Sequence, residues 1–325
     1  MTRINIVIAA GLVLAVTLPA VSAQAQVART FVSAAGSDSN NCANVSTPCR
    51  HFATAFAATA PSGEIFVLDP ANYGSLTITH AVSIQGHGWA SIAPPNGGNA
   101  ITINAGPGDS ISIHGVAIDG TGATGGTNGI VFNSGASLTV TDCVVKDFVY
   151  NNTADTGNGI LIQPSSSVNF AITNTTAAHN GNVGIFYEPP SGSFNANGVI
   201  DHVVVDSNFH GIDLITTLAT GGTTVVTISN TIASNNSCCG IFASNGPGAL
   251  KVSIDSVSVS GNTGFWGIEA DNTAAKVLLG RSVITGNATG VAVANGATVY
   301  TYGDNRINLN GTDISGTLNT SFATR

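Results

Sequence analysis

A block of nine residues recurs seven times in this chain, each time without a gap. The first copy reads VTDCVVKDF, and the others keep its pattern of apolar and small polar residues. The copies begin at Val140, Ile172, Ile200, Ile228, Ile254, Leu279 and Tyr302. Two degenerate copies precede them, near Ile84 and Ile113. Successive full copies lie 23 to 32 residues apart, and repeats of that length predict a solenoid.

A glycine followed by isoleucine or valine stands between successive blocks. The pairs begin at Gly129, Gly159, Gly184, Gly211, Gly240, Gly267 and Gly290. Inside each short segment apolar residues recur at every second position, which indicates strands, and no window holds the stripe of a helical repeat. The regular leucine pattern of leucine-rich repeats is absent as well. We therefore predict an all-β solenoid in which each repeat forms one coil of about three short strands.

The last position of the nine-residue block is almost always asparagine. The column reads Phe148, Asn180, Asn208, Asn236, Asn262, Asn287 and Asn310. Asparagine tolerates left-handed backbone geometry in tight turns, and stacked amides can hydrogen-bond from coil to coil about 4.8 Å apart. We predict an internal asparagine ladder, which needs no ligand to explain it.

Residues 1–25 have the pattern of a secretory signal peptide. Arg3 precedes an apolar run from Ile6 to Leu18, and small residues lead to a cleavage point after Ala25. The run is shorter than the roughly 20 residues that a membrane-spanning helix needs. The sequence therefore predicts an exported protein, located outside the cell, at the cell surface or in the periplasm, without a membrane span in the mature chain.

Residues 26–62 are expected to form an N-terminal cap ahead of a β-helix at 63–325. Cys42 and Cys49 flank a short polar loop, and an exported protein favours a disulfide between them. A short helix is predicted from Pro48 to Ala60, with Thr47 as its N-cap and with two phenylalanines, at 52 and 56, on one face. Such a helix would cover the open end of the first coil.

Few residues of the chain are charged. They make up 8% of it, with 17 acidic residues against 9 lysines and arginines and a formal net charge of −8. Nucleic-acid binding requires clustered lysine and arginine, so this balance excludes a nucleic-acid partner.

The coil pattern resembles the right-handed parallel β-helix of pectin-lyase-like proteins. Residues 30–38 (TFVSAAGSD), 48–50 (PCR) and 63–70 (GEIFVLDP) further resemble the N-terminal region of exported bacterial β-helix proteins of unassigned function. The resemblance implies a fold more than an activity, since such proteins include lyases, hydrolases, tailspikes and adhesins. Of the polygalacturonase elements, Asn-Thr-Asp and Asp-Asp are missing. Gly86-His87-Gly88 falls in the first coil, and Arg306-Ile307 is followed by Asn308.

The strand after each Gly-Ile pair yields the candidate site. If isoleucine points inward, the positions two and four after the glycine point outward. The first outward column is Val131, Leu161, Phe186, Asp213, Phe242, Glu269 and Ala292; the second is Asn133, Gln163, Glu188, Ile215, Ser244, Asp271 and Ala294. Acids and aromatic rings thus gather on neighbouring coils. Acids that only keep a solvated face soluble are the alternative interpretation.

Two functions follow from this face. The favoured one is non-catalytic binding of a polysaccharide or another cell-surface partner, with Phe186 and Phe242 as ligand-binding residues. The alternative is a polysaccharide lyase or glycoside hydrolase that acts through Asp213, Glu269, Glu188 and Asp271. Acidic uronans are disfavoured unless calcium bridges the charges, so neutral or acetylated glycans are expected.

Three cysteines remain for which the sequence predicts no metal site. Cys143 stands in a block column of small and apolar residues and is expected to pack in the core. Cys238 and Cys239 are adjacent and either form a disulfide or stay as thiols. Because no histidine joins them at metal-ligand spacing in the sequence, zinc is not expected. No cofactor is predicted, and no motif indicates calcium.

Overall fold

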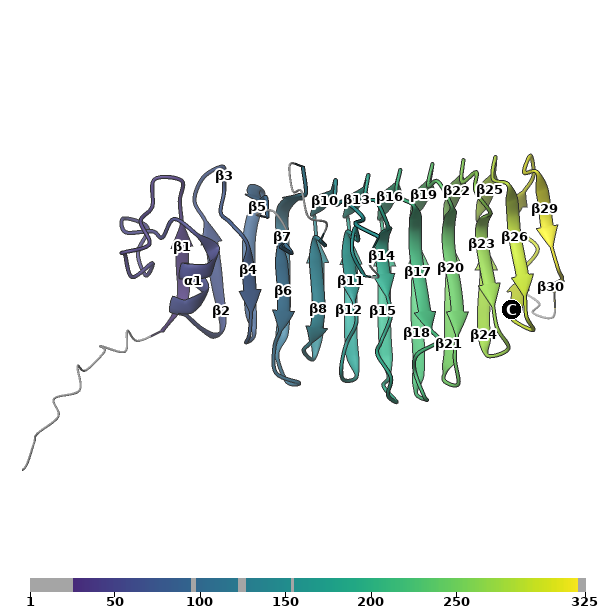
Figure 1. Ribbon diagram of the computed structural model, residues 1–325, viewed down its shortest axis with the longest axis horizontal. Helices are drawn as coiled ribbons and strands as arrows, with labels where there is room; N and C mark the ends of the chain where they lie inside the picture. The colour runs from purple at the N-terminus through teal and green to yellow at the C-terminus, as the bar shows by residue number, and fades with distance from the viewer. Residues whose placement is uncertain (1–25, 95–97, 122–126, 153–154, 321–325) are drawn as a thin grey trace, which may run out of the picture.

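The computed structural model describes residues 26–94, 98–121, 127–152 and 155–320. Within these ranges the chain winds into a parallel β-solenoid with a single α-helix at its N-terminal end (Figure 1). The sequence prediction of an all-β solenoid is confirmed. The predicted signal peptide, residues 1–25, lies outside the described residues.

One wall of the solenoid is a ten-stranded sheet to which each described coil contributes one strand. All its neighbouring strands pair in parallel. Its strands are β4 (Leu76–Ile78), β6 (Ile101–Asn104), β8 (Ile130–Ser134), β11 (Ile160–Ile162), β14 (Val183–Tyr187), β17 (His210–Thr216), β20 (Cys239–Asn245), β23 (Trp266–Asp271), β26 (Thr289–Ala294) and β29 (Thr312–Ser315). We call this wall the ten-stranded sheet.

The twenty-stranded sheet forms the other two walls. The wall that follows the ten-stranded sheet along the chain holds β9 (Ser137–Thr141), β12 (Val168–Thr173), β15 (Ala196–Asp201), β18 (Thr223–Ser229), β21 (Ala249–Asp255), β24 (Ala275–Gly280), β27 (Thr298–Thr301) and β30 (Leu318–Asn319). The last wall holds β10 (Val144–Lys146), β13 (Thr176–Ala178), β16 (Val204–Asp206), β19 (Ile232–Ser234), β22 (Ser258–Ser260), β25 (Val283–Thr285) and β28 (Arg306–Ile307). Two long strands, β5 (Val82–Ile92) and β7 (Ser110–Asp119), serve both walls. The N-terminal end adds β1 (Val27–Val32), β2 (Thr59–Val67) and β3 (Ala71–Asn72).

The register of the strands follows the repeats in the sequence. Ile172 pairs with Val140 on one side and with Ile200 on the other, and the column continues through Ile228 and Ile254. The last copy alone departs, because Leu279 pairs with Thr301 instead of Tyr302. Four residues further on, the expected register returns. These inward side chains stack into one continuous apolar core.

The glycine of each Gly-Ile pair is required by close approach between coils. A β-carbon at Gly240 would lie 2.4 Å from the carbonyl oxygen of Gly267, and one at Gly211 would lie 2.4 Å from that of Gly240. No side chain fits at such distances. The glycine therefore lets neighbouring coils stay in contact at the start of each strand of the ten-stranded sheet.

The predicted asparagine ladder is present and buried. From Asn208 to Asn310, each side-chain oxygen accepts the backbone N–H and the side-chain amide of the asparagine one coil before it, and the oxygen of Asn180 accepts the backbone N–H of Phe148. Asn310 donates in turn to the carboxylate of Asp313. The expected left-handed geometry belongs to the residue before each asparagine, for example φ 56° at Ser207 and 55° at Asn235. The ladder asparagine itself therefore packs inward without that backbone conformation.

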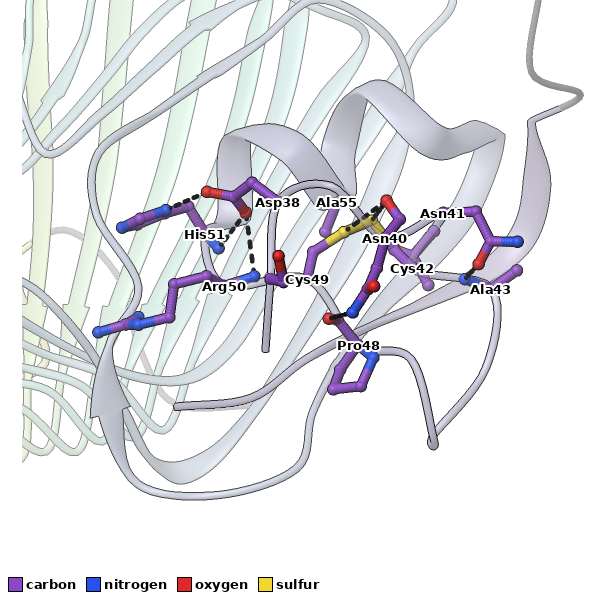
Figure 2. Close-up of a disulfide and its surroundings, with 12 residues drawn as sticks. Asp38, Asn40, Asn41, Cys42, Ala43, Pro48, Cys49, Arg50, His51 and Ala55 are labelled. Carbon is purple, nitrogen blue, oxygen red and sulfur yellow. Dashed lines mark hydrogen bonds and ion pairs between the residues drawn. A yellow bond between two sulfur atoms is a disulfide. The ribbon is translucent and has the colours of Figure 1, made fainter. Parts of the chain in front are cut away.

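The predicted disulfide between Cys42 and Cys49 is present, beside the helix (Figure 2). The helix α1 (Phe52–Ala58) is shorter than expected at both ends, and His51, not Thr47, is its N-cap. Cys49 is held in a strand-like bridge to Val32, so the backbone cannot become helical there.

The carboxylate of Asp38 supports the start of the helix. It accepts the backbone N–H groups of Arg50 and His51 at 3.0 Å each, and it contacts the ring of His51 at 2.5 Å (Figure 2). Phe52 and Phe56 are buried as predicted, the first against Tyr73. Residues 59–61, expected to end the helix, instead begin β2, which pairs with β1 in one direction and with β5 in the other.

Candidate functional site

The outward face of the ten-stranded sheet carries the predicted acids in the predicted register. Asp213 on β17 pairs with Phe242 on β20, which pairs with Glu269 on β23. Asp271 occupies the second outward column of β23, and Glu188 directly follows β14. The two predicted columns therefore both lie on the outward face of the ten-stranded sheet.

The expected exposure of the first column is wrong for most of its members. Asp213 is only 4% exposed, Glu269 6% and Phe186 7%. Phe186 packs against the side chains of neighbouring coils, in a cluster made of Val131, Leu161, Val183 and Phe186 with Ile215 at its margin. These side chains point away from the core but are shielded from solvent, because the side chains of neighbouring coils cover them. Phe242 is half-buried, and its ring stacks on Trp266 with centroids 6.3 Å apart.

Asp213 is held by a histidine that the sequence reasoning missed. The Nδ1 atom of His210 lies 3.1 Å from one carboxylate oxygen of Asp213 and 2.9 Å from the other. Burial raises the pKa of Asp213, while the hydrogen bond and the charge of His210 act in the opposite direction. The pair is a buried carboxylate and imidazole on one strand.

Glu269 is a second carboxyl group on this face whose pKa is raised. Burial, followed by the negative charge of Asp271, raises its pKa to about 7. Its Oε2 atom is buried and has no hydrogen-bond partner among the described residues. Burial also raises the pKa of Glu188, with smaller contributions from the charges of Asp155 and Asp213. A carboxyl group that stays protonated near neutral pH can donate a proton.

Aromatic rings border these acids at the edge where each coil enters the ten-stranded sheet. Phe209 and Phe265 are 47% and 58% exposed, and Trp266 is half-buried. We call Phe209, Phe265 and Trp266 the aromatic edge. Phe209 contacts His210, and Phe265 contacts Trp266, with ring centroids 4.8 and 5.1 Å apart. The residues of this edge come from the two positions before each Gly-Ile pair. They were missed in the sequence because the outward columns were counted from the glycine onward.

Cys238 and Cys239 lie in the coil between the two aromatic pairs. The N–H of Cys238 donates to the carbonyl of Phe209, and the N–H of Phe265 donates to the carbonyl of Cys238. The two cysteines form a disulfide, one of the two states that the sequence left open. No histidine stands at metal-ligand spacing from them in the sequence, but strand pairing places His210 directly beside Cys239.

Basic side chains lie elsewhere on the solenoid. Within the strand bounds given above, the ten-stranded sheet contains four acids and neither lysine nor arginine. Lys251 and Lys276 are neighbours on β21 and β24, where they line a depression of about 270 Å³ together with Val225 and Tyr300. The remaining cysteine, Cys143, is a buried thiol whose burial raises its pKa to about 11, in agreement with the predicted packing role.

Comparison with known proteins gives structural similarities only. No known family and no curated protein sequence matches the chain. Its structure is similar to the pectate lyase Pel9A, with a TM-score of 0.47 and 19% identity over 93% of this chain and 80% of that chain. The A-module of the Azotobacter vinelandii mannuronan C-5 epimerase AlgE6 gives a TM-score of 0.38 and 14% identity, over 81% of this chain and 91% of that chain. The GH136 lacto-N-biosidase from Eubacterium ramulus gives a TM-score of 0.37 and 9% identity, over 90% of this chain and 67% of that chain.

The strand pairing establishes a parallel β-solenoid, the kind of fold that the sequence resemblance to pectin-lyase-like proteins implies. Among the described residues, no helix is long and apolar enough to cross a membrane.

Proposed function

We propose that this protein binds a neutral or acetylated polysaccharide along the ten-stranded sheet, at the aromatic edge. The observation that supports this proposal is the exposure of Phe209 and Phe265, at 47% and 58%, at the edge of a face that also carries the partly exposed acids Glu188 and Asp271. Aromatic faces pack against the apolar faces of sugar rings, and polar groups next to them bind the hydroxyls. The predicted signal peptide would bring the protein to where such polymers occur.

The spacing of the rings favours an extended chain as the ligand. Phe209 and Phe265 lie two coils apart along the axis, which corresponds to about 10 Å. Alternate rings of an extended β-linked polysaccharide repeat at a comparable distance. A chain that runs parallel to the solenoid axis would therefore meet both phenylalanines, with Trp266 beside the second.

The charge of the sheet supports a neutral ligand. Glu188, Asp213, Glu269 and Asp271 gather here without lysine or arginine in the strands, so a uronate polymer would be repelled unless calcium lay between the two. The lysines that would attract such a polymer lie on another wall.

A second candidate, glycoside hydrolysis, is favoured by one observation. Glu269 combines a pKa of about 7 with a buried Oε2 atom that has no partner among the described residues, as a general acid requires. Asp213 lies two coils away, about 10 Å along the axis, just beyond the separation of about 6.5 to 9.5 Å that inverting enzymes use. Asp213, Glu188 and Asp271 are the candidates for its partner base.

Binding is tested by affinity electrophoresis in gels that contain xylan, β-glucan, galactomannan, acetylated xylan or polygalacturonate, with and without calcium. We expect retardation by a neutral or acetylated polymer, and its loss in the double variant Phe209→Ala/Phe265→Ala. Tyr302→Ala removes an aromatic side chain that is 42% exposed on a different part of the surface and serves as the matched control. Retardation that survives the double variant would refute the aromatic edge as the binding site.

Turnover is measured on any polymer that binds, by following reducing ends and unsaturated products. Binding without products supports the non-catalytic function. Products that disappear in Glu269→Gln, while retardation in the gel persists, support hydrolysis with Glu269 as the acid. Products that persist in Glu269→Gln would exclude Glu269 from the chemistry.

A further inference from the structure

Three metal-binding side chains meet at the centre of the aromatic edge. The ligand atoms of His210, Cys238 and Cys239 all lie within 4.8 Å of one another. His210 comes from β17 and the cysteines from the next coil, and the pairing of His210 with Cys239 fixes them together. Their separation of 28 residues in the sequence concealed this arrangement.

We propose that His210, Cys238 and Cys239 bind a single thiophilic d10 cation, Zn²⁺ or Cu⁺, once the disulfide between the two cysteines is reduced. Two thiolates and one imidazole are ligands that both ions accept. Three ligands complete a trigonal Cu⁺ site, whereas Zn²⁺ would add water as the fourth. The reduced and the disulfide-bonded protein would then differ in their ability to hold the ion.

Asp213 gives independent support for this site. Its carboxylate is 4% exposed and contacts Nδ1 of His210, which leaves Nε2 as the nitrogen available to a cation. A carboxylate on the second nitrogen of a metal-binding histidine fixes the tautomer and orientation of the ring and makes it a stronger ligand. The arrangement also explains why an acid is buried on this face beside a histidine.

The surroundings suit a soft cation. Cys238 and Cys239 are 4% and 1% exposed, so the metal–thiolate bonds would be shielded from competing protein and thiol ligands. The other described thiol, Cys143, is buried apart from them with its sulfur near backbone carbonyls, and the Cys42–Cys49 disulfide lies in the N-terminal cap. Neither offers a competing histidine–dithiol set.

The redox step balances with an external dithiol as the reductant. The dithiol gives two electrons and two protons to the Cys238–Cys239 disulfide and becomes a disulfide itself. The cation then displaces the two thiol protons and binds the thiolates. In the reverse direction a disulfide accepts two electrons from the two thiolates and becomes a dithiol; the Cys238–Cys239 disulfide forms again and the ion is released, so metal content reports the redox state of this pair.

The test compares oxidised protein with protein reduced by a phosphine and desalted without oxygen. Each is titrated with Zn²⁺ and, separately, Cu⁺ against a chromophoric chelator, and folding is checked by circular dichroism. We expect one equivalent of at least one ion to bind to the reduced protein, and at least a tenfold weaker affinity in Cys238→Ser/Cys239→Ser and in His210→Gln. Asp213→Asn, which keeps the shape of the side chain, should weaken binding about 10- to 100-fold.

Cys143→Ser is the matched control and should bind like the unaltered chain. Ions bound by reduced Cys42 and Cys49 would appear equally in the Cys238→Ser/Cys239→Ser variant and are subtracted by that comparison. The proposal is overturned if the folded, reduced protein binds neither ion, or if the cysteine variant binds as tightly as the unaltered chain. The glycan experiments use the oxidised protein, so the two proposals stand or fall separately.

Discussion

The side-chain oxygen of Asn262 accepts two hydrogen bonds from Asn236, one from its backbone N–H and one from its side-chain amide, each 3.0 Å long. Asn262 also donates to the carbonyl of Ala233 and to the next asparagine of the ladder, Asn287. One buried amide thus satisfies turn groups of three consecutive coils.

Replacement of Asn236 or Asn262 by leucine should lower the free energy of unfolding by about 1–3 kcal/mol, because buried turn N–H groups lose their acceptor. Thermal midpoints of the variants measure the effect. Asn197→Leu, at an exposed position on β15, is the control and should change little. Unchanged midpoints for both ladder variants would show that the bonds do not contribute to stability.

Gly240→Ala should destabilise the protein by about 1–3 kcal/mol, since the new methyl group would meet the carbonyl of Gly267 at 2.4 Å and push two coils apart. Gly108→Ala is the matched control, because a β-carbon there meets nothing within 4 Å. Urea denaturation of both variants tests the expectation. Equal loss of stability in the two would contradict the role of close approach between coils.

Glu269 should make stability fall as pH rises. Its pKa is about 7 in the folded protein against 4.5 without burial, so the folded state holds the proton more tightly and the unfolded chain releases it first. Below about pH 4.5 Glu269 is protonated in both the folded and the unfolded chain, so its burial costs no stability there. Between there and pH 7 the native protein loses on the order of 2–3 kcal/mol relative to Glu269→Gln, whose side chain stays neutral.

Denaturation midpoints of the two proteins at pH 4 and pH 8 provide the measurement, with pH 4 as the internal control. The variant should match the unaltered chain at pH 4 and exceed it at pH 8. A difference that is the same at both pH values would mean that Glu269 ionises normally.

Deletion of residues 26–62 should yield an aggregating protein. It removes β1, α1 and the first part of β2, which uncovers apolar side chains and a strand edge at the first coil. Light scattering and size-exclusion chromatography measure the outcome. The double variant Cys42→Ser/Cys49→Ser keeps the covering segment and should stay soluble, whereas a soluble and cooperatively folding deletion protein would refute the capping role.

Much of the fold could be predicted because the repeat encodes it locally. Apolar residues at every second position and the glycine before each isoleucine predict the register in most coils: Ile172 pairs with Ile200, whereas Leu279 pairs with Thr301. The start of α1 could not be predicted in this way. It depends on Asp38, whose carboxylate binds the backbone of Arg50 and His51 from more than ten residues away.

The sequence predicted which side chains of the candidate site point outward, but not how deeply they are buried. Alternation along a strand says that Phe186 and Asp213 point outward, but their burial depends on the side chains of neighbouring coils. His210 was overlooked because the outward columns were counted from the glycine that follows it, and because the cysteine pair comes beside it only when strands are aligned across coils. Pairwise contacts between coils, not local pattern, decide the chemistry of this face.

The asparagine ladder also has a direction. Every side-chain amide from Asn180 onward donates one N–H toward the C-terminal side and the other to a backbone carbonyl of the preceding coil, so the amide-to-amide hydrogen bonds all run in one direction along the axis. Aligned hydrogen bonds of this kind polarise one another. The positive end of the row meets the carboxylate of Asp313, the same pairing of an anion with aligned N–H groups that stabilises the first turn of an α-helix. A row of polarised hydrogen bonds thus runs along the solenoid from coil to coil, and the carboxylate of Asp313 accepts the last of them.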